Sequence, residues 1–191
     1  MRQYQICQRC VMDTTDSNIQ FNEHGICDHC LSFDNHIAPH WKTDESGRTS
    51  LEKIIHRIKQ EGKKKEFDCI MGMSGGADSS YMLHIAVKEF GLRPLVFHVD
   101  GGWNSDIAVN NINVMIDKLN LDLFTEVINW EEMRDFQLTY FKSGLANIDV
   151  PQDHAFIATL YNFADKHRIR YILNGGNYST ECVRNPLEWI Y

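Results

Sequence analysis

The sequence contains no apolar stretch long enough to cross a membrane, and no apolar signal segment is visible at its N-terminus. Basic residues are scarce as well: 19 Lys and Arg stand against 26 Asp and Glu, for a formal net charge of −7. This charge balance weighs against a broad nucleic-acid-binding surface. The absences exclude a membrane-spanning protein and predict a globular chain in the reducing cytoplasm.

Two widespread nucleotide-binding motifs are also missing. The glycine-rich segment Ser74-Gly75-Gly76-Ala77-Asp78-Ser79-Ser80 has neither the spacing nor the lysine of a Walker P-loop, and it lacks G-x-G-x-x-G. It nevertheless joins an apolar run at 67–73 to an apolar helical pattern from Tyr81. At such a junction, backbone N–H groups and the helix dipole both favour an anion. The segment therefore predicts a nucleotide site, although a glycine-rich turn without a ligand is the alternative.

Six cysteines are present, and four of them form two C-x2-C pairs. These are Cys7 with Cys10 and Cys27 with Cys30, separated by sixteen residues. This spacing is typical of a four-thiolate structural zinc site. Two disulfides or a redox dithiol are alternatives, but the expected reducing compartment disfavours disulfides. Residues 1–31 are therefore predicted to form a zinc-ribbon-like module, which a metal would hold together because the segment is too short to build a core.

The rest of the chain predicts an α/β domain at 51–191, after a polar connector at 32–50. Expected strands alternate with expected helices along this domain. The strands are at 67–73, 95–100, 121–128 and 170–173, and the helices are at 51–60, from Tyr81 to Gly91, 106–119, 130–143 and 153–167. This alternation predicts a doubly wound parallel sheet, in which ligands bind beyond the carboxyl ends of the strands. Three segments fall at that edge, at 74–80, 100–105 and 174–181.

Individual residues at these places are candidates for chemistry. Asp100 could bind a ribose hydroxyl or a metal, and Trp103 could stack on a ligand, although both could simply belong to loop structure. Titratable and amide groups cluster at the start of an apolar helix, as a polar-substrate site would require: Asp149, Gln152, Asp153 and His154. Alternatively, Asp153 is a helix N-cap and Pro151 a helix stop. The candidate catalytic residues are Ser74, Asp78, Asp153 and His154.

The segment Ser74–Ser80 closely resembles the S-G-G-x-D-S-S signature of the PP-loop ATP pyrophosphatases, whose fold is of the adenine-nucleotide alpha-hydrolase type. Further stretches extend the likeness over nearly all of the chain. They are Cys-Gln-Arg-Cys-Val-Met-Asp-Thr-Thr, Gly-Ile-Cys-Asp-His-Cys, His-Val-Asp-Gly-Gly-Trp-Asn-Ser, Pro-Gln-Asp-His and Asn-Gly-Gly-Asn-Tyr-Ser-Thr-Glu-Cys-Val. In this order they resemble the N-acetyl sugar amidotransferases of bacterial surface-polysaccharide biosynthesis, including lipopolysaccharide O-antigen and pseudaminic- or legionaminic-type glycans.

The resemblance implies that ATP activates the acetamido group of a nucleotide-linked sugar and that ammonia converts it into an acetamidino group. It also implies roles for particular residues. Ser74, Gly75, Gly76, Ser79 and Ser80 would cradle the pyrophosphate, and Asp78 would hold Mg²⁺. The main chain of Val96–His98, centred on Phe97, would meet adenine, and Gly175 and Gly176 would lie against the nucleotide. The resemblance further implies that ammonia comes from a separate glutaminase, and the sequence shows no Cys-His glutaminase motif of its own.

Two other functions fit parts of the sequence. A zinc-containing PP-loop enzyme of tRNA thiolation would need a nucleic-acid surface and further reactive cysteines, and the acidic balance and single Cys182 count against it. A non-catalytic zinc-ribbon adaptor would not need the intact S-G-G-x-D-S-S segment. The ending Trp189-Ile190-Tyr191 is apolar, from which we expect the chain to be a C-terminally truncated piece of a longer protein.

Overall fold

The computed structural model describes residues 2–190, so Met1 and the final Tyr191 of the apolar ending lie outside the described residues. The chain forms two compact units. Ser50–Ser143 and Ile148–Gly175 make up the larger, here called the sheet unit. The residues up to Thr49, together with Gly144–Asn147 and the segment from Gly176, make up the ribbon unit.

The sheet unit contains one parallel sheet of four strands. In chain order these are β1 (Cys69–Gly72), β2 (Pro94–Asp100), β3 (Leu123–Val127) and β4 (Ile172–Leu173). They lie side by side in the order β3-β2-β1-β4, and every pairing is parallel. The two central strands are apolar and buried along nearly their whole length, as expected when helices cover both faces of a parallel sheet. The expected α/β fold with a parallel sheet is confirmed.

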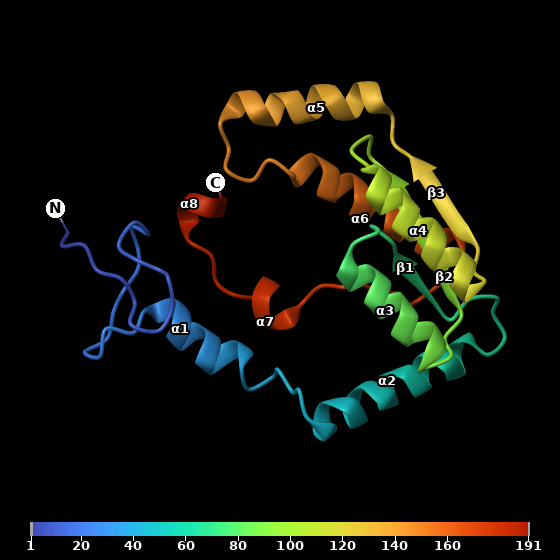
Figure 1. Ribbon diagram of the computed structural model, residues 1–191, viewed down its shortest axis with the longest axis horizontal. Coiled ribbons are helices and arrows are strands. Elements are labelled where there is room, and N and C mark those ends of the chain that lie inside the picture. The colour runs from blue at the N-terminus through green and yellow to red at the C-terminus, as the bar shows by residue number, and fades with distance from the viewer. Residues whose placement is uncertain (1, 191) are drawn as a thin grey trace. The chain divides into compact units, whose positions relative to one another are not determined.

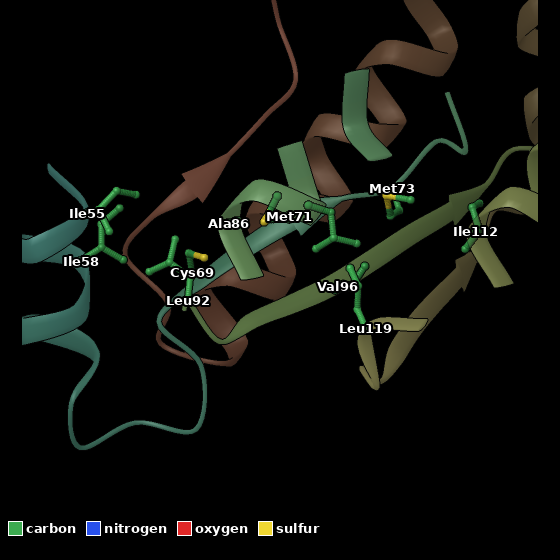
Figure 2. Close-up of a cluster of buried hydrophobic side chains, with 11 residues drawn as sticks. Ile55, Ile58, Cys69, Met71, Met73, Ala86, Leu92, Val96, Ile112 and Leu119 are labelled. Carbon is green, nitrogen blue, oxygen red and sulfur yellow. The ribbon is translucent and has the colours of Figure 1, made fainter. Parts of the chain in front are cut away.

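Helices cover one face of this sheet as the chain winds between strands (Figure 1). They are α2 (Glu45–Gly62), α3 (Ala77–Lys88) and α4 (Asp106–Leu119). Cys69, Met71 and Met73 alternate along and just beyond β1 and point to this face, because successive strand residues project to opposite sides. Figure 2 shows them packed with buried side chains of the three helices and with Val96 of β2.

The opposite face of the sheet is covered by α6 (Val150–Lys166), and α5 (Trp130–Ser143) packs against α6. Here Ile70 of β1 and Leu95, Phe97 and Val99 of β2 form a second core with Ala164 of α6. The Phe97 and Phe163 rings lie 4.4 Å apart between their centroids. With both faces covered, only the edges and ends of the strands remain for a ligand.

The ribbon unit contains short elements: α1 (Asp28–Ser32), the π-helical turn η1 (Phe33–Ile37), α7 (Tyr178–Glu181) and α8 (Leu187–Ile190). The stretch at 32–50, expected to be irregular, is therefore partly helical. The helix α2 starts at Glu45, six residues before its apolar periodicity begins, because the Asp44 carboxylate accepts the N–H groups of Ser46 and Gly47. No helix among residues 2–190 is both apolar enough and long enough to span a bilayer.

Candidate functional site

The strand order places a reversal of the chain beside β1. The chain moves outward from β1 through β2 to β3, and then returns to form β4 on the other side of β1. In open parallel sheets, ligands bind beyond the carboxyl ends of the strands at such a reversal. The segment after β1 and the segment after β4 both reach this point, which makes it a candidate ligand site.

The turn after β1, which we call the anion loop, consists of Met73, Ser74, Gly75 and Gly76. Gly75 has φ +78, a conformation that side chains rarely adopt, and a Cβ there would lie 2.4 Å from the carbonyl oxygen of Ala108 in α4. Gly76 is the N-cap residue of α3, with an extended conformation. The loop therefore bends tightly against the start of α4 and leads its backbone into the N-terminus of α3, where unpaired N–H groups favour an anion.

Serine hydroxyls line the same loop. The Oγ atoms of Ser74 and Ser79 lie 3.1 Å apart, and the Gly76 N–H points to Ser74 Oγ over an N···O distance of 3.3 Å. The Ser74 N–H meets Ser79 Oγ at 3.4 Å. Both N–H contacts are longer than an ordinary hydrogen bond of about 2.9 Å. These N–H groups and hydroxyls therefore form only weak hydrogen bonds within the protein, and they could donate to a phosphate oxygen instead. Ser80, half-buried one residue further along α3, adds a third hydroxyl to this end of the helix.

The segment after β4 lies directly against the start of α3. A Cβ added to Gly175 would be 3.2 Å from both the carbonyl carbon of Asp78 and the nitrogen of Ser79. Asp78 itself is exposed in the first turn of the helix. The close approach brings Gly175 and the signature segment together at one point, as the parallel topology predicts. Gly176, the other expected nucleotide-binding glycine, is the next residue; it is exposed and is the first residue of the C-terminal segment of the ribbon unit.

The end of β2 contributes a second loop at 100–105. Asp100 Oδ1 accepts the Gly102 N–H at 2.9 Å, so one carboxylate oxygen holds the turn. Trp103 is 57 % exposed and packs edge-to-face on Trp130, with 5.2 Å between the ring centroids. The side chain of Phe97, by contrast, belongs to the core, so a nucleotide contact at Phe97 would involve the main chain.

Three polar side chains support these loops: His98 and Asn104 link the two, and Asn111 connects α4 to the anion loop. These side chains were not singled out from the sequence, although Asn104 lies in the expected segment 100–105. His98 is buried in β2, and its Nδ1 lies 2.7 Å from the carbonyl oxygen of Met73. Its Nε2 lies 3.2 Å from Asn104 Nδ2. Asn111 of α4 donates from Nδ2 to the Gly75 carbonyl oxygen at 3.0 Å. The signal in the sequence was His98 as a polar residue inside the apolar run 95–99.

Asp153 lies in the first turn of α6, on the other face of the sheet, and His154 follows it; both are exposed. The alternative that Asp153 caps this helix is wrong, because α6 already begins at Val150 and the Asp153 N–H donates within it to the Asp149 carbonyl. The neighbouring Gln152 reaches the end of β2, with its Oε1 3.6 Å from a Cβ built on Gly101. In the described chain, no hydrogen bond or ion pair links Asp153 or His154 to residues 74–80.

The ribbon unit holds the four cysteines of the C-x2-C pairs in one cluster. The sulfurs of Cys7, Cys10, Cys27 and Cys30 all lie within 4.8 Å of one another. Cys7 and Cys30 are 3.9 Å apart and Cys10 and Cys27 are 3.6 Å apart, and none of them forms a disulfide. Four sulfurs at about 2.3 Å from a tetrahedral zinc would be separated by about 3.8 Å. The spacing of the cluster therefore fits a four-thiolate zinc site that leaves no open coordination position.

The backbone around this cluster favours thiolate at one position. Burial acts to raise the pKa of Cys7, but N–H groups of Cys27, Arg9 and Cys10 approach the sulfur and lower the pKa overall to about 6. Burial raises the pKa values of Cys27 and Cys30. Four thiolates packed this closely would repel one another unless a cation lay between them. A cation bound between the four sulfurs would therefore favour deprotonation of Cys10, Cys27 and Cys30 as well as Cys7.

The C-terminal segment packs on the second cysteine knuckle. Between Cys27 and Cys30, His29 contacts the buried Asp16 carboxylate at 2.7 Å through Nε2 and the Arg184 carbonyl oxygen at 3.1 Å through Nδ1. The Arg184 guanidinium pairs with Asp28, and Glu188 accepts the Ser17 N–H at 3.0 Å. Within the ribbon unit, these contacts hold the chain around Arg184 and Glu188 against the N-terminal part that carries the cysteines.

No protein-family model matches the chain, and no curated protein is a significant match. Solved structures do match. The glutamine-dependent NAD⁺ synthetase of Acinetobacter baumannii, solved in complex with ADP, is 22 % identical, with a TM-score of 0.52 over 66 % of this chain and 25 % of that one. The NMN synthetase of Francisella tularensis is 21 % identical, with a TM-score of 0.48 over 66 % of this chain and 53 % of that one.

The NH3-dependent NAD synthetase of Campylobacter jejuni, solved with a nitrate ion, is 14 % identical, with a TM-score of 0.49 over 68 % of this chain and 56 % of that one. The matched region thus spans roughly half or less of each of these synthetases. The likeness concerns the fold. The chain has an α/β fold of the NAD synthetase-like PP-loop type, with a four-cysteine cluster near its N-terminus that could bind zinc.

Proposed function

We propose that this chain is an ATP-dependent, AMP-forming amidotransferase that converts the acetamido group of a nucleotide-linked sugar into an acetamidino group. The observation that carries the proposal is the anion loop at the chain reversal beside β1, with Gly175 packed against Asp78 and Ser79. A loop of this geometry, with weakly occupied N–H and hydroxyl donors, suits a phosphate chain. The resemblance of the sequence to the amidotransferases supplies the reaction.

The reaction begins with a poor electrophile, because the oxygen of an amide is a poor leaving group. Attack of that oxygen on the α-phosphorus of ATP would release pyrophosphate and form an O-adenylated imidate. Ammonia would then add to the imidate carbon, and the C–O bond would break, so that AMP leaves with the former amide oxygen. The sugar keeps its own nitrogen and gains the nitrogen of ammonia, which gives the amidine.

The residues of the loop would act on the phosphates in this scheme. The Ser74 and Gly76 N–H groups and the hydroxyls of Ser79 and Ser80 would bind the pyrophosphate part and stabilise the negative charge that develops on it as the bond to the α-phosphorus breaks. A single carboxylate near phosphates fits Mg²⁺, which often binds one or two carboxylates plus substrate oxygens, and Asp78 would be that ligand. The metal would neutralise charge on the leaving pyrophosphate.

The sugar and the ammonia source are part of the proposal. Asp153 and His154 are exposed at the start of α6, whose Gln152 reaches the end of β2, and we assign this helix start to the polar sugar. A solved glutamine-dependent NAD⁺ synthetase shares the fold, which agrees with a nitrogen-transferring reaction on this scaffold. Ammonia would come from a separate glutaminase. Zinc in the four-cysteine cluster would be structural.

An isotope experiment tests the reaction. The full-length protein is incubated with Mg²⁺-ATP, an ammonium salt and nucleotide-linked acetamido sugars labelled with oxygen-18 in the acetamide carbonyl. The proposal expects AMP and pyrophosphate in equal amounts, with the label in AMP and an amidine in the sugar. Label that remains in the sugar product would exclude O-adenylation. Formation of ADP and phosphate would contradict the assignment to the PP-loop reaction class.

A further inference from the structure

Two side chains outside the anion loop hydrogen-bond to its backbone: His98 of β2 and Asn111 of α4. His98 contacts the carbonyl oxygen of Met73 at 2.7 Å, and Asn111 donates to the carbonyl oxygen of Gly75 at 3.0 Å. These two carbonyls alternate along the loop with the N–H groups of Ser74 and Gly76. The two side chains therefore hold the peptide group between Met73 and Ser74 and the peptide group between Gly75 and Gly76.

The geometry of the peptide bond turns these contacts into an orientation of the donors. No peptide bond among the described residues is cis, and in a planar trans peptide the C=O and the following N–H point in opposite directions. A carbonyl of Met73 held toward β2 directs the Ser74 N–H the other way. In the same manner, a carbonyl of Gly75 held toward α4 directs the Gly76 N–H away from α4.

The same contacts keep negative partial charge away from the place where the anion would bind. A glycine turn can flip its peptide planes easily, because glycine tolerates both signs of φ. A flip of the peptide after Gly75 would present a carbonyl oxygen to a phosphate and would remove a donor. Asn111 opposes that flip, because a flip would break its hydrogen bond to the Gly75 carbonyl oxygen.

The hydrogen-bonding pattern of His98 also defines which ring nitrogen carries the proton. The amide nitrogen of Asn104 can only donate, so His98 Nε2 accepts, and a carbonyl oxygen can only accept, so Nδ1–H donates to Met73. Asn104 thereby selects the tautomer that holds the loop. It belongs to the segment 100–105, which continues into Ser105, the N-cap of α4.

From these contacts we infer that Asn111 and His98 are positioning residues, which fix the peptide planes of the anion loop so that the Ser74 and Gly76 N–H groups face a pyrophosphate group. Neither side chain touches the anion. The inference rests on the proposed nucleotide site and adds to it how the loop is held in its binding conformation before the ligand arrives. Such preorganisation lowers the free-energy cost of binding.

Asn111→Ala is the main test, and Asn110→Ala is its matched control, since both asparagines are exposed on α4 and only Asn111 reaches the loop. The dissociation constants of Mg²⁺-pyrophosphate and of adenosine are measured by titration calorimetry. Loss of one orienting hydrogen bond is expected to weaken pyrophosphate binding by about 5- to 10-fold in Asn111→Ala. Adenosine affinity, melting temperature and the Asn110→Ala values should stay at the wild-type level.

Nuclear magnetic resonance can show the orientation of the loop N–H groups directly, through the amide proton shifts of Ser74 and Gly76. A purely structural role of Asn111 would leave these ligand-induced shifts unchanged. In the wild type, the amide proton resonances of Ser74 and Gly76 should shift downfield on addition of Mg²⁺-pyrophosphate, and in Asn111→Ala the Gly76 shift should shrink. For His98, the amide nitrogen of His98→Asn can take the place of Nδ1. This variant should therefore retain more pyrophosphate affinity than His98→Ala.

The outcomes separate this inference from the function on which it rests. If the wild type binds pyrophosphate and Asn111→Ala binds it equally well, the positioning role of Asn111 is overturned while the nucleotide site stands. If Asn111→Ala weakens the binding of pyrophosphate and of adenosine to the same degree, Asn111 stabilises the fold in general and the inference is again wrong. If the wild type binds neither Mg²⁺-pyrophosphate nor Mg²⁺-ATP, the proposed function fails, and the inference fails with it.

Discussion

Replacement of Gly75 by alanine perturbs the anion loop in two ways that the structure separates. The residue has φ +78, and its Cβ would lie 2.4 Å from the carbonyl oxygen and 2.8 Å from the Cα of Ala108, which are backbone atoms of α4. The positive φ alone costs an alanine about 1 kcal/mol. Overpacking against a backbone that cannot easily move adds about 1 to 3 kcal/mol. We therefore expect Gly75→Ala to lower the free energy of unfolding by about 2 to 4 kcal/mol.

Gly91 in the same unit is the matched control. It has φ +57 after α3, but a Cβ there would meet only the flexible end of Lys59, at 3.5 Å. Gly91→Ala should therefore show the cost of φ alone, about 1 kcal/mol. Urea unfolding followed by far-ultraviolet circular dichroism measures both variants. If Gly75→Ala is no less stable than Gly91→Ala, the argument from close contact with α4 is refuted.

Two further predictions concern the ribbon unit and the start of α2. Elemental analysis should find about one zinc per chain. Cys10→Ser or Cys27→Ser should lose most of this zinc, whereas Cys182→Ser, at an exposed cysteine outside the cluster, should retain it. Full zinc content in Cys27→Ser would contradict the zinc site. Hydrogen bonds from the Ser46 hydroxyl and the Gly47 N–H lower the pKa of Asp44, so its carboxylate stabilises the start of α2 above the unfolded pKa of about 3.9. That stabilisation should be lost as pH falls through the lower folded pKa; circular dichroism of the wild type should show this acid-dependent loss of helix, and Asp44→Asn, which cannot titrate, should lack that part of it.

Much of the sheet unit can be predicted from the sequence, because its strands, turns and helices are indicated by local residue patterns. The buried strands β1 and β2 are continuous apolar runs, and glycine residues followed by an apolar helical pattern mark the turn into α3. The C-x2-C spacing likewise predicted which four sulfurs would meet. The helical start of α2 was missed, because its signal is the capping carboxylate of Asp44 and not an apolar periodicity.

The sequence by itself determined the type of fold, the segment that forms the anion loop and the four-cysteine cluster, because composition, periodicity and spacing express these features locally. Only the tertiary structure decided what holds that loop. Nothing near Asn111 in the sequence indicates that its amide meets the Gly75 carbonyl, and the order β3-β2-β1-β4 alone brings Gly175 against α3. The physical reason is that such contacts depend on how helices and strands pack, which pairs residues that are far apart in the chain.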